Sequence, residues 1–322
     1  MSNNPHAPIF GVFIPQGWKM ELAGIDGAEN KWNKAVEIAV KAEELGFDSI
    51  WVYDHFHNVP KPAHEAVFEC WTTLAAVSQV TSRVRLGQMV GCNSYRHPSV
   101  LAKITSTIDV ISGGRLDWGI GAGWYENEYK GYGFEFPKPK DRIGMLEESV
   151  EIVKSMWTKA DTTYDGRYYQ LVRANCDPKP LQQPMPPVWI GGGGEQLTLR
   201  VVAKHADCSN FGGKPTDFAR KCEILKGHCA AVGRDYDTIT KTRSPEIFIR
   251  ETEAEVATGG SRWGEAPESW RSGNLVGTPE QVAEKIRNYI AMGCRGFVPR
   301  CADYPYTTSL ELFATKVMPA FR

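Results

Sequence analysis

The chain has 322 residues, of which 42% are hydrophobic and 23% are charged, and its formal net charge is -1. This length suffices for one large α/β barrel or for two smaller domains, and the near-zero charge gives no reason to expect binding to nucleic acid or to an anionic membrane surface. No apolar run approaches the roughly 20 residues that span a bilayer, residues 1–8 lack the apolar core of a signal peptide, and the eight cysteines include no C-x-x-C pair, so we expect reduced thiols in a cytoplasmic protein.

Predicted strands and helices alternate along the chain. Short apolar runs predict strands at residues 9–14, 50–53, 84–90, 115–120, 188–190, 206–211, within 239–250, and at 296–300. Apolar residues at helical spacing predict helices at residues 33–45, 68–80, 98–112, 143–157, 195–203, 217–232, 279–292 and 309–317. Pro98 suits the first turn of its helix, and Thr278 is well placed as an N-cap.

Two insertions interrupt this alternation. Residues 162–171, with Asp165-Gly166 at their centre, predict a hairpin within an insertion at about 161–175. Residues 251–273 are polar, glycine-rich and irregular, which predicts a mobile insertion at about 251–275 that could act as a lid.

The alternation predicts an α/β fold of one domain over residues 1–322, a (β/α)8 TIM barrel with insertions. Its active site should lie at the C-terminal ends of the strands. A doubly wound sheet is the alternative, but the first strand runs into Phe13-Ile-Pro-Gln16 without the dinucleotide-binding glycine fingerprint.

The second predicted strand ends abruptly at Asp54 and His55. A carboxylate beside an imidazole can simply hold a loop in place, but their position at a strand's C-terminal end favours catalysis. His55-Phe-His57 also allows a metal site, as in a barrel metallohydrolase. Such a site needs histidines at other strand ends, whereas the fifth strand ends in Gly191 and His205 precedes the sixth, so we expect no metal.

Four glycines, Gly191-Gly-Gly-Gly194, lie between the fifth strand and a predicted helix start near Glu195. Free backbone N–H groups and the helix dipole make such a turn suitable for a phosphate. The glycines could instead serve only a tight turn with positive φ. No Lys-Ser/Thr follows, so the turn is not a nucleotide P-loop.

Two neighbouring strand ends could hold a ring system. The segment 121–128, Gly-Ala-Gly-Trp-Tyr-Glu-Asn-Glu, combines small residues that permit close approach with the flat surfaces of Trp124 and Tyr125. A strand-to-helix turn with an aromatic plug is the alternative. The segment 87–98 follows the adjacent strand, and its His97 precedes a proline and a helix, so we interpret His97 as structural.

These stretches together resemble the luciferase-like monooxygenase superfamily of flavin and deazaflavin enzymes, and within it the branch that uses the deazaflavin coenzyme F420. The resemblance covers nearly the whole chain and is carried by residues 42–55, 95–98 with 101–103, 111–115, 119–124, 187–195 and 276–282.

The resemblance implies roles for individual residues. Asp54 would contact the deazaflavin ring, His55 would transfer a proton, and the Met89–Val90 peptide would be cis against the back of the ring. The implied cofactor-binding residues are Asp54, Met89, Val90, Gly91, Cys92, Ala122, Gly123, Trp124, Tyr125, Glu126 and Asn127 for the ring and ribityl chain, and Gly192, Gly193, Gly194 and Glu195 for the phosphate. The family's sugar-phosphate dehydrogenases carry a glutamate acid where this chain has Trp124, which argues against their substrate chemistry.

We therefore expect an F420-dependent oxidoreductase that transfers hydride between the deazaflavin and a small organic substrate, apolar or aromatic in character. Asp54 and His55 are the expected catalytic residues, and Trp18, Phe56 and Trp124 the expected substrate wall. The alternatives are an FMN-dependent monooxygenase that uses reduced flavin and oxygen, and a coenzyme-binding protein without catalysis. A homodimer is expected because family members are often dimers.

Overall fold

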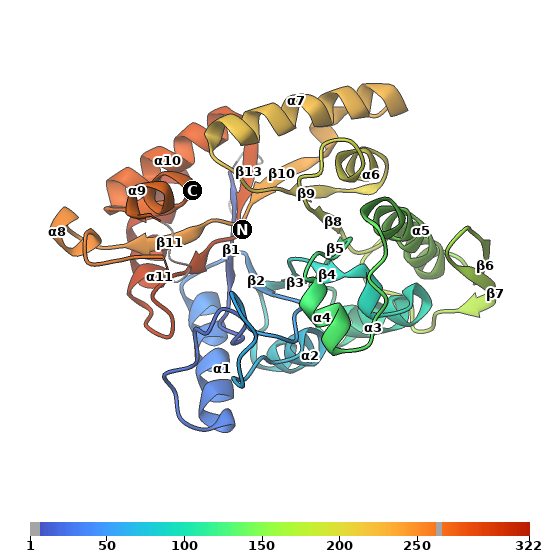
Figure 1. Ribbon diagram of the computed structural model, residues 1–322, viewed down its shortest axis with the longest axis horizontal. Coiled ribbons are helices and arrows are strands. Elements are labelled where there is room, and N and C mark those ends of the chain that lie inside the picture. The colour runs from blue at the N-terminus through green and yellow to red at the C-terminus, as the bar shows by residue number, and fades with distance from the viewer. Residues whose placement is uncertain (1–6, 262–265) are drawn as a thin grey trace.

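Eight parallel strands close into a barrel in the computed structural model, which describes residues 7–261 and 266–322 (Figure 1). The barrel strands are β1 (Ile9–Phe13), β2 (Ser49–Val52), β3 (Arg85–Gln88), β5 (Leu116–Gly121), β8 (Val188–Gly191), β9 (Cys208–Asn210), β10 (Thr240–Arg243) and β13 (Cys294–Phe297). They pair in the order β3-β2-β1-β13-β10-β9-β8-β5, and a β3–β5 pairing closes the ring, with the short β4 (Gly91–Cys92) added beside β5. The predicted (β/α)8 fold is confirmed.

Helices surround the barrel on its outside (Figure 1). They are α1 (Ala28–Glu44), α2 (Cys70–Val80), α3 (Pro98–Ile111), α5 (Pro139–Thr158), α6 (Thr198–His205), α7 (Pro215–Val232), α10 (Pro279–Ala291) and α11 (Thr308–Leu312), the last continuing as a π-helical turn over Phe313–Val317. Pro98 opens α3, and Thr278 caps α10 in a reciprocal capping box with Gln281, as the sequence predicts. The helix expected from Glu195 begins instead at Thr198.

Large aromatic side chains fill the inside of the barrel. Trp51 and Trp189 meet there with ring centroids 4.5 Å apart. Gly11 and Gly87 on the flanking strands leave the room that Trp51 needs, because a Cβ at either position would overlap its indole. The inside of the barrel is thus a packed core.

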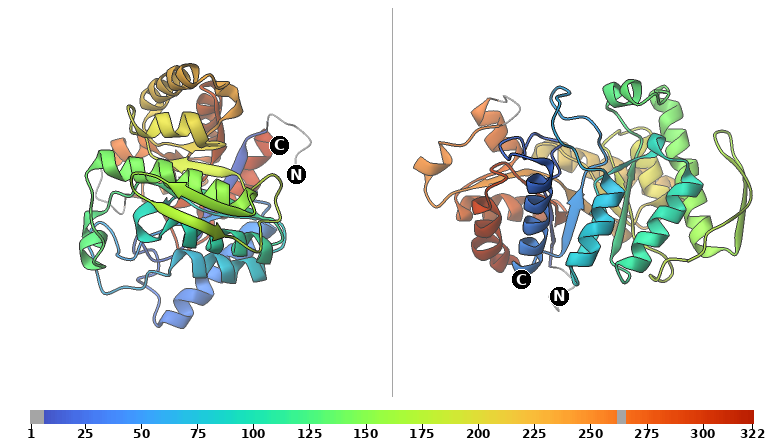
Figure 2. Two further views of the ribbon diagram at one scale, coloured as in Figure 1. Left: turned by 90° about the vertical axis from the view of Figure 1, so that its right-hand side faces the viewer. Right: turned by 90° about the horizontal axis from the view of Figure 1, so that it is seen from below.

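The hairpin insertion is confirmed. The strands β6 (Asp161–Asp165) and β7 (Gln170–Asn175) pair antiparallel and project from the barrel beside α5 (Figure 2).

The second insertion is more regular than its composition predicts. It holds α8 (Glu253–Val256) and α9 (Pro267–Gly273) and leads into β12 (Leu275–Gly277), which joins β11 (Glu246–Ile249) and β14 (Arg300–Cys301) in a small parallel sheet. The prediction that this stretch is irregular is wrong, because local hydrogen bonds and one buried side chain order it. Thr252 and Glu255 form a capping box, and the buried Trp270 donates its indole N–H to Glu246 at 2.6 Å. Residues 262–265 of this insertion lie outside the described residues.

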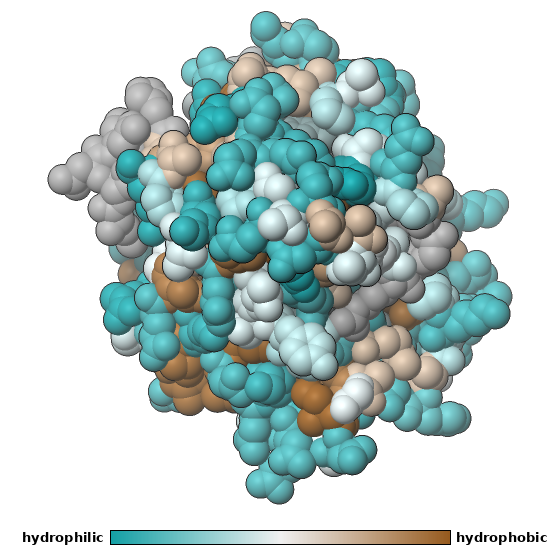
Figure 3. All heavy atoms as spheres, turned by 90° about the vertical axis from the view of Figure 1, so that its left-hand side faces the viewer, coloured by the Kyte–Doolittle hydropathy of each residue, from teal (hydrophilic) through white to brown (hydrophobic). Residues whose placement is uncertain are grey.

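The surface offers few large apolar areas on the face shown in Figure 3, where hydrophilic side chains dominate and apolar ones form small separate patches. No helix within residues 7–261 and 266–322 is long and apolar enough to cross a membrane. All eight cysteines are free and buried.

Candidate active site

A cavity of about 340 Å³ lies at the C-terminal ends of β2, β4, β5 and β8. The structure brings most of the predicted site residues into its wall: Trp18, Asp54, His55, Met89, Val90, Gly91, Cys92, Ala122, Gly123, Trp124, Tyr125, Gly192, Gly193 and Gly194. Lining residues that the sequence did not single out include Tyr53, Tyr95, Arg142, Ile143 and Thr198. Segments far apart in the chain therefore meet at one end of the barrel, as parallel strands require.

Four predicted site residues do not line this cavity. Phe56 packs instead against Tyr95, with ring centroids 4.8 Å apart. Glu126 and Asn127 are exposed on the short helix α4 (Glu126–Gly131). Glu195 forms an ion pair with Arg220, so its side chain is engaged outside the cavity wall.

The expected lid also lies apart from the cavity wall. None of the described residues in the 251–273 stretch lines the cavity. Trp270 of this stretch packs against Phe248 of β11, on the side sheet that extends the barrel.

His55 is held in the cavity wall by a carboxylate and by aromatic rings. Its Nδ1 lies 2.8 Å from Oε2 of Glu128, and its side chain is 13% exposed. Trp18 stacks flat on the imidazole, with centroids 4.2 Å apart and an interplanar angle of 4°. Trp124 and Tyr125 approach the ring edge-on, at 5.8 and 6.0 Å. Among the two imidazole nitrogens, Nε2 is the one left for a bound substrate.

Glu128 is a fully buried carboxylate that the sequence analysis did not identify. Its Oε1 accepts the backbone N–H groups of Phe56 and His57 at 2.8 and 2.9 Å, and its Oε2 accepts the hydroxyl of Tyr95 at 2.6 Å. Burial alone would raise the pKa of Glu128, but the hydrogen bonds from His55, Tyr95 and the backbone hold it below its ordinary value. The sequence offers no sign of this role, because Glu126 and Glu128 belong to the same acidic turn.

Asp54 is also buried, yet its partners differ from those of Glu128. Arg96 contacts both carboxylate oxygens, at 2.7 and 3.0 Å, and the backbone N–H of Cys92 donates at 2.8 Å. Burial would lower the pKa of Arg96, but Asp54 and Glu69 raise it above its ordinary value. Asp54 thus ties the end of β2 to β4 through the Cys92 N–H, and to Arg96 through a charge pair.

The predicted ring site has a closely packed floor. The Met89–Val90 peptide is cis, as the resemblance implies. The Val90 side chain occupies space that only glycine leaves free, since a Cβ at Gly121 or at Gly191 would lie 2.6 Å from it. Burial raises the pKa of the neighbouring Cys92 to about 12, so this thiol stays neutral and is an unsuitable nucleophile.

The glycine run forms a cradle that side chains would fill. Gly192 has φ +118°, a conformation that favours glycine. A Cβ at Gly193 would lie 2.6 Å from Nζ of Lys221, and one at Gly194 would lie 2.7 Å from the hydroxyl of Thr198. Arg142 lines the same cavity, and its buried Nε has no hydrogen-bond partner among the described residues. The Gly192 N–H already donates to the carbonyl of Asn210 at 3.0 Å. The N–H groups of the two following glycines, beside the Thr198 hydroxyl and the Lys221 ammonium, are therefore the ones that suit a phosphate.

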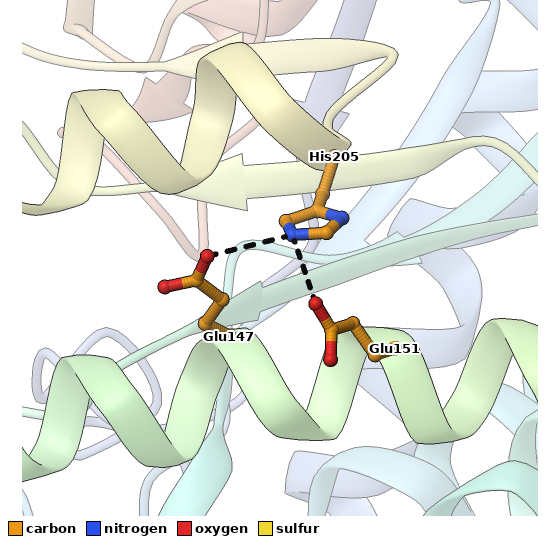
Figure 4. Close-up of side chains that lie close together, drawn as sticks. All are labelled: Glu147, Glu151 and His205. Atoms are coloured by element: carbon orange, nitrogen blue, oxygen red, sulfur yellow. Dashed lines mark ion pairs between the residues drawn. The ribbon is translucent and has the colours of Figure 1, made fainter. Parts of the chain in front are cut away.

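A second histidine–glutamate cluster lies outside the cavity, between α5 and α6 (Figure 4). Nε2 of His205 is 3.8 Å from Glu147 and 3.7 Å from Glu151, which lie on successive turns of α5. Lys204 forms an ion pair with Glu147 as well. Burial, with the charge of Lys154, lowers the pKa of His205. None of these groups lines the cavity at the strand ends.

Comparison with known proteins agrees with this architecture. The family model described as luciferase-like monooxygenase matches residues 9–259. A protein of Amycolatopsis mediterranei named F420-dependent glucose-6-phosphate dehydrogenase is 39% identical over 174 residues, which cover 53% of this chain and only about half, 49%, of that relative. A protein of the same name from Nocardia farcinica is 28% identical over 321 residues, covering 89% of this chain and 93% of the relative.

Solved structures share the fold at lower identity. An F420-dependent secondary alcohol dehydrogenase in complex with an F420–acetone adduct superposes with a TM-score of 0.82 at 19% identity, over 98% of this chain and 99% of the other. EDTA monooxygenase from Chelativorans sp. BNC1 superposes with a TM-score of 0.79 at 17% identity, over 98% and 93% of the two chains. The family match over most of the chain confirms the resemblance seen in the sequence: this protein belongs to the luciferase-like monooxygenase family.

Proposed function

We propose that this protein is a coenzyme F420-dependent oxidoreductase that transfers hydride between the deazaflavin and a small organic substrate. The named relatives support the choice of coenzyme, because one of them aligns with this chain over 93% of its own length. The observation that carries the proposal is the cavity itself. It gathers His55 and the Gly192–Gly194 cradle, which the residues themselves suggested, and the Met89–Val90 floor, whose role the resemblance implies.

Different residues of the chain would bind the coenzyme and transfer the proton. When bound, the deazaflavin supplies the carbon that gives or takes the hydride. Val90 and the glycines at the ends of β5 and β8 would seat its ring, while Gly192 to Gly194 and Thr198 would hold its phosphate. His55 would transfer the accompanying proton through Nε2, because Nδ1 is engaged by Glu128. Reduction of a carbonyl, for example, needs one hydride at carbon and one proton at oxygen.

The cavity wall favours an apolar or aromatic substrate. Trp18, Trp124 and Tyr125 surround His55 with aromatic surface. Among the described lining residues Arg142 is the only lysine or arginine, and its guanidinium packs over the Phe136 ring at 4.1 Å. With Trp124 in place of the glutamate of the sugar-phosphate dehydrogenases, we propose a hydride acceptor such as a ketone, an activated alkene or a nitroaromatic compound, or an alcohol in the reverse direction.

Tryptophan fluorescence tests the coenzyme directly. The chain has ten tryptophans, and Trp18 and Trp124 lie in the cavity wall, so a bound ring system should quench emission. We expect quenching by F420 in the micromolar range or below and much weaker quenching by FMN. Preference for FMN would favour the alternative, a flavin-dependent monooxygenase, and oxygen uptake with reduced flavin would then be measured. Binding of neither would overturn the proposal, and tight F420 binding without turnover would favour a non-catalytic coenzyme carrier.

We further infer a homodimer and a cytoplasmic location. The second inference rests on the eight free, buried cysteines, which suit a reducing compartment. Light scattering that gives a mass near the 35.9 kDa of one chain would contradict the dimer.

A further inference from the structure

Two buried carboxylates lie close to His55 in the fold, and they have different partners. Asp54 precedes His55 in the sequence, whereas Glu128 comes 73 positions later. We propose that Glu128 is the positioning residue for His55, which it holds in one tautomer and whose protonated form it stabilises, and that Asp54 does neither. The importance of this pair for catalysis rests on the function proposed above, but the pair itself can be tested without any coenzyme.

Asp54 forms its ion pair with Arg96 and not with His55. Both of its oxygens contact the Arg96 guanidinium, and one of them also accepts the backbone N–H of Cys92. Both oxygens are thus occupied by the guanidinium, which also pairs with Glu69 at 2.6 Å. No hydrogen bond joins Asp54 to the His55 ring among the described residues, so adjacency in the sequence does not make it the partner of the imidazole.

Glu128 has the geometry that Asp54 lacks. Its Oε2 lies 2.8 Å from Nδ1 of His55, and its Oε1 is fixed by the backbone N–H groups of Phe56 and His57. Two donors on one oxygen orient the carboxylate, so the other oxygen must face the imidazole. A carboxylate only accepts, which requires a proton on Nδ1 and leaves Nε2 as the nitrogen that gains or loses the transferred proton.

The stacked aromatic ring completes the positioning. Trp18 lies parallel to the imidazole at 4.2 Å, so the His55 ring cannot turn away from Glu128 without breaking this contact. After His55 gives its Nε2 proton to a substrate oxygen, the ring is neutral and still donates from Nδ1 to Glu128. One carboxylate thus serves both protonation states of the catalytic cycle.

Tyr95 also contacts Glu128 and allows a second test. Its hydroxyl donates to Oε2, the same oxygen that His55 uses. Without this hydroxyl, Oε2 of Glu128 interacts with His55 alone, so the negative charge stabilises the imidazolium more strongly. Without the carboxylate, this stabilisation is lost. The two changes should therefore move the protonation of His55 in opposite directions, and a merely structural role for Glu128 predicts no such opposition.

Glu128→Gln makes the sharpest change. The two backbone donors would hold the amide oxygen where Oε1 lies, so the amide NH₂ would face Nδ1 of His55. Since an NH₂ group donates, the imidazole should switch to the tautomer with its proton on Nε2. Loss of the negative charge should also weaken the protonated form of the imidazole.

Histidine nitrogen NMR of the uniformly ¹⁵N-labelled full chain would read both properties. His55 is assigned among the seven histidines by its absence in His55→Ala. In the wild type we expect the neutral ring to carry its proton on Nδ1. Glu128→Gln should invert that tautomer and lower the titration midpoint, while Tyr95→Phe should raise the midpoint.

Glu126→Gln is the matched control. It makes the same chemical change two residues away on the same turn, at an exposed side chain that pairs with Lys130. We expect it to leave the tautomer and the midpoint of His55 unchanged.

Wild-type His55 with its neutral proton on Nε2 would overturn the proposal, and this result requires no variant to fold. An unchanged tautomer in a folded Glu128→Gln protein would overturn it equally. Because F420 is absent from the sample, failure of coenzyme binding would count against the proposed function alone. Once an acceptor is known, Glu128→Gln should lower kcat with little change in KM and shift the pH–rate profile.

Discussion

The molecule holds two histidine–glutamate clusters whose residue types are nearly the same and whose surroundings differ completely. At the barrel mouth, His55 and Glu128 are 2.8 Å apart, buried among aromatic rings beside a cavity. On the outer wall, His205 stands 3.7 and 3.8 Å from Glu151 and Glu147, between two helices (Figure 4).

The difference shows that burial and neighbouring charges determine how strongly a histidine and a glutamate interact. At the mouth, no lysine or arginine among residues 7–261 and 266–322 is hydrogen-bonded to Glu128, and fixed backbone donors hold its carboxylate in place. On the outer wall, Lys204 competes with His205 for Glu147, and Glu151 is 43% exposed, so water screens the charges. The fixed geometry of the first pair suits the proton transfer proposed above, and the second pair joins α5 to α6 as a weak surface contact.

The largest contrast should appear in turnover. His55→Ala removes the proposed proton donor and should lower kcat about 10²–10⁴-fold, while F420 remains bound by the ring floor and the phosphate cradle. His205→Ala, on the outer wall, should stay within about twofold of the wild type. The absorbance of the oxidised coenzyme follows turnover, and fluorescence titration checks binding. Equal losses in the two variants would break the comparison, and an unaffected His55→Ala enzyme would remove His55 from the mechanism.

The second largest contrast should appear in the free energy of unfolding when Glu128 or Glu151 is replaced. Glu128→Ala leaves two backbone N–H groups and the Tyr95 hydroxyl buried without their acceptor, which should cost about 2–4 kcal/mol. Glu151→Ala removes a partly exposed charge and should change the free energy of unfolding by less than about 0.5 kcal/mol. Urea denaturation of both variants, with F420 absent, measures the difference. A loss at Glu151 as large as that at Glu128 would show that exposure does not weaken the outer cluster.

The smallest effect concerns pH. Because the pKa of His205 is lowered in the folded protein, the unfolded chain takes up this proton first as the pH falls below about 6.5, and stability declines. His205→Gln should remove that decline, by no more than about 1 kcal/mol. The pKa of Glu128 is also lowered, so its contribution is present above about pH 4.5 and is lost only in stronger acid. Thermal unfolding between pH 2 and 8 would test the two windows, and an unchanged slope near pH 6 in His205→Gln would contradict this assignment.

Local patterns in the sequence were enough to predict the barrel and most of the cavity wall. The alternation of apolar runs with helical spacing marks strands and helices, and parallel strands must place Asp54, Met89, Ala122 and Gly192 at the same end of the barrel. The glycine run and the Asp165-Gly166 turn can be predicted because their backbone conformation depends on the residues next to them in the sequence. These features need no knowledge of distant contacts.

The partners of the buried charges were decided only by the tertiary structure. Sequence adjacency favours Asp54 as the partner of His55, yet Arg96 takes Asp54, and Glu128 reaches the imidazole from another strand end. Likewise, Phe56 follows His55 directly but packs away from the cavity, and Glu126 is exposed while Glu128 is buried two residues later. Periodicity tells which face of an element is apolar, but the pairing of two charges depends on how closely two loops approach, and only the closed barrel sets that distance.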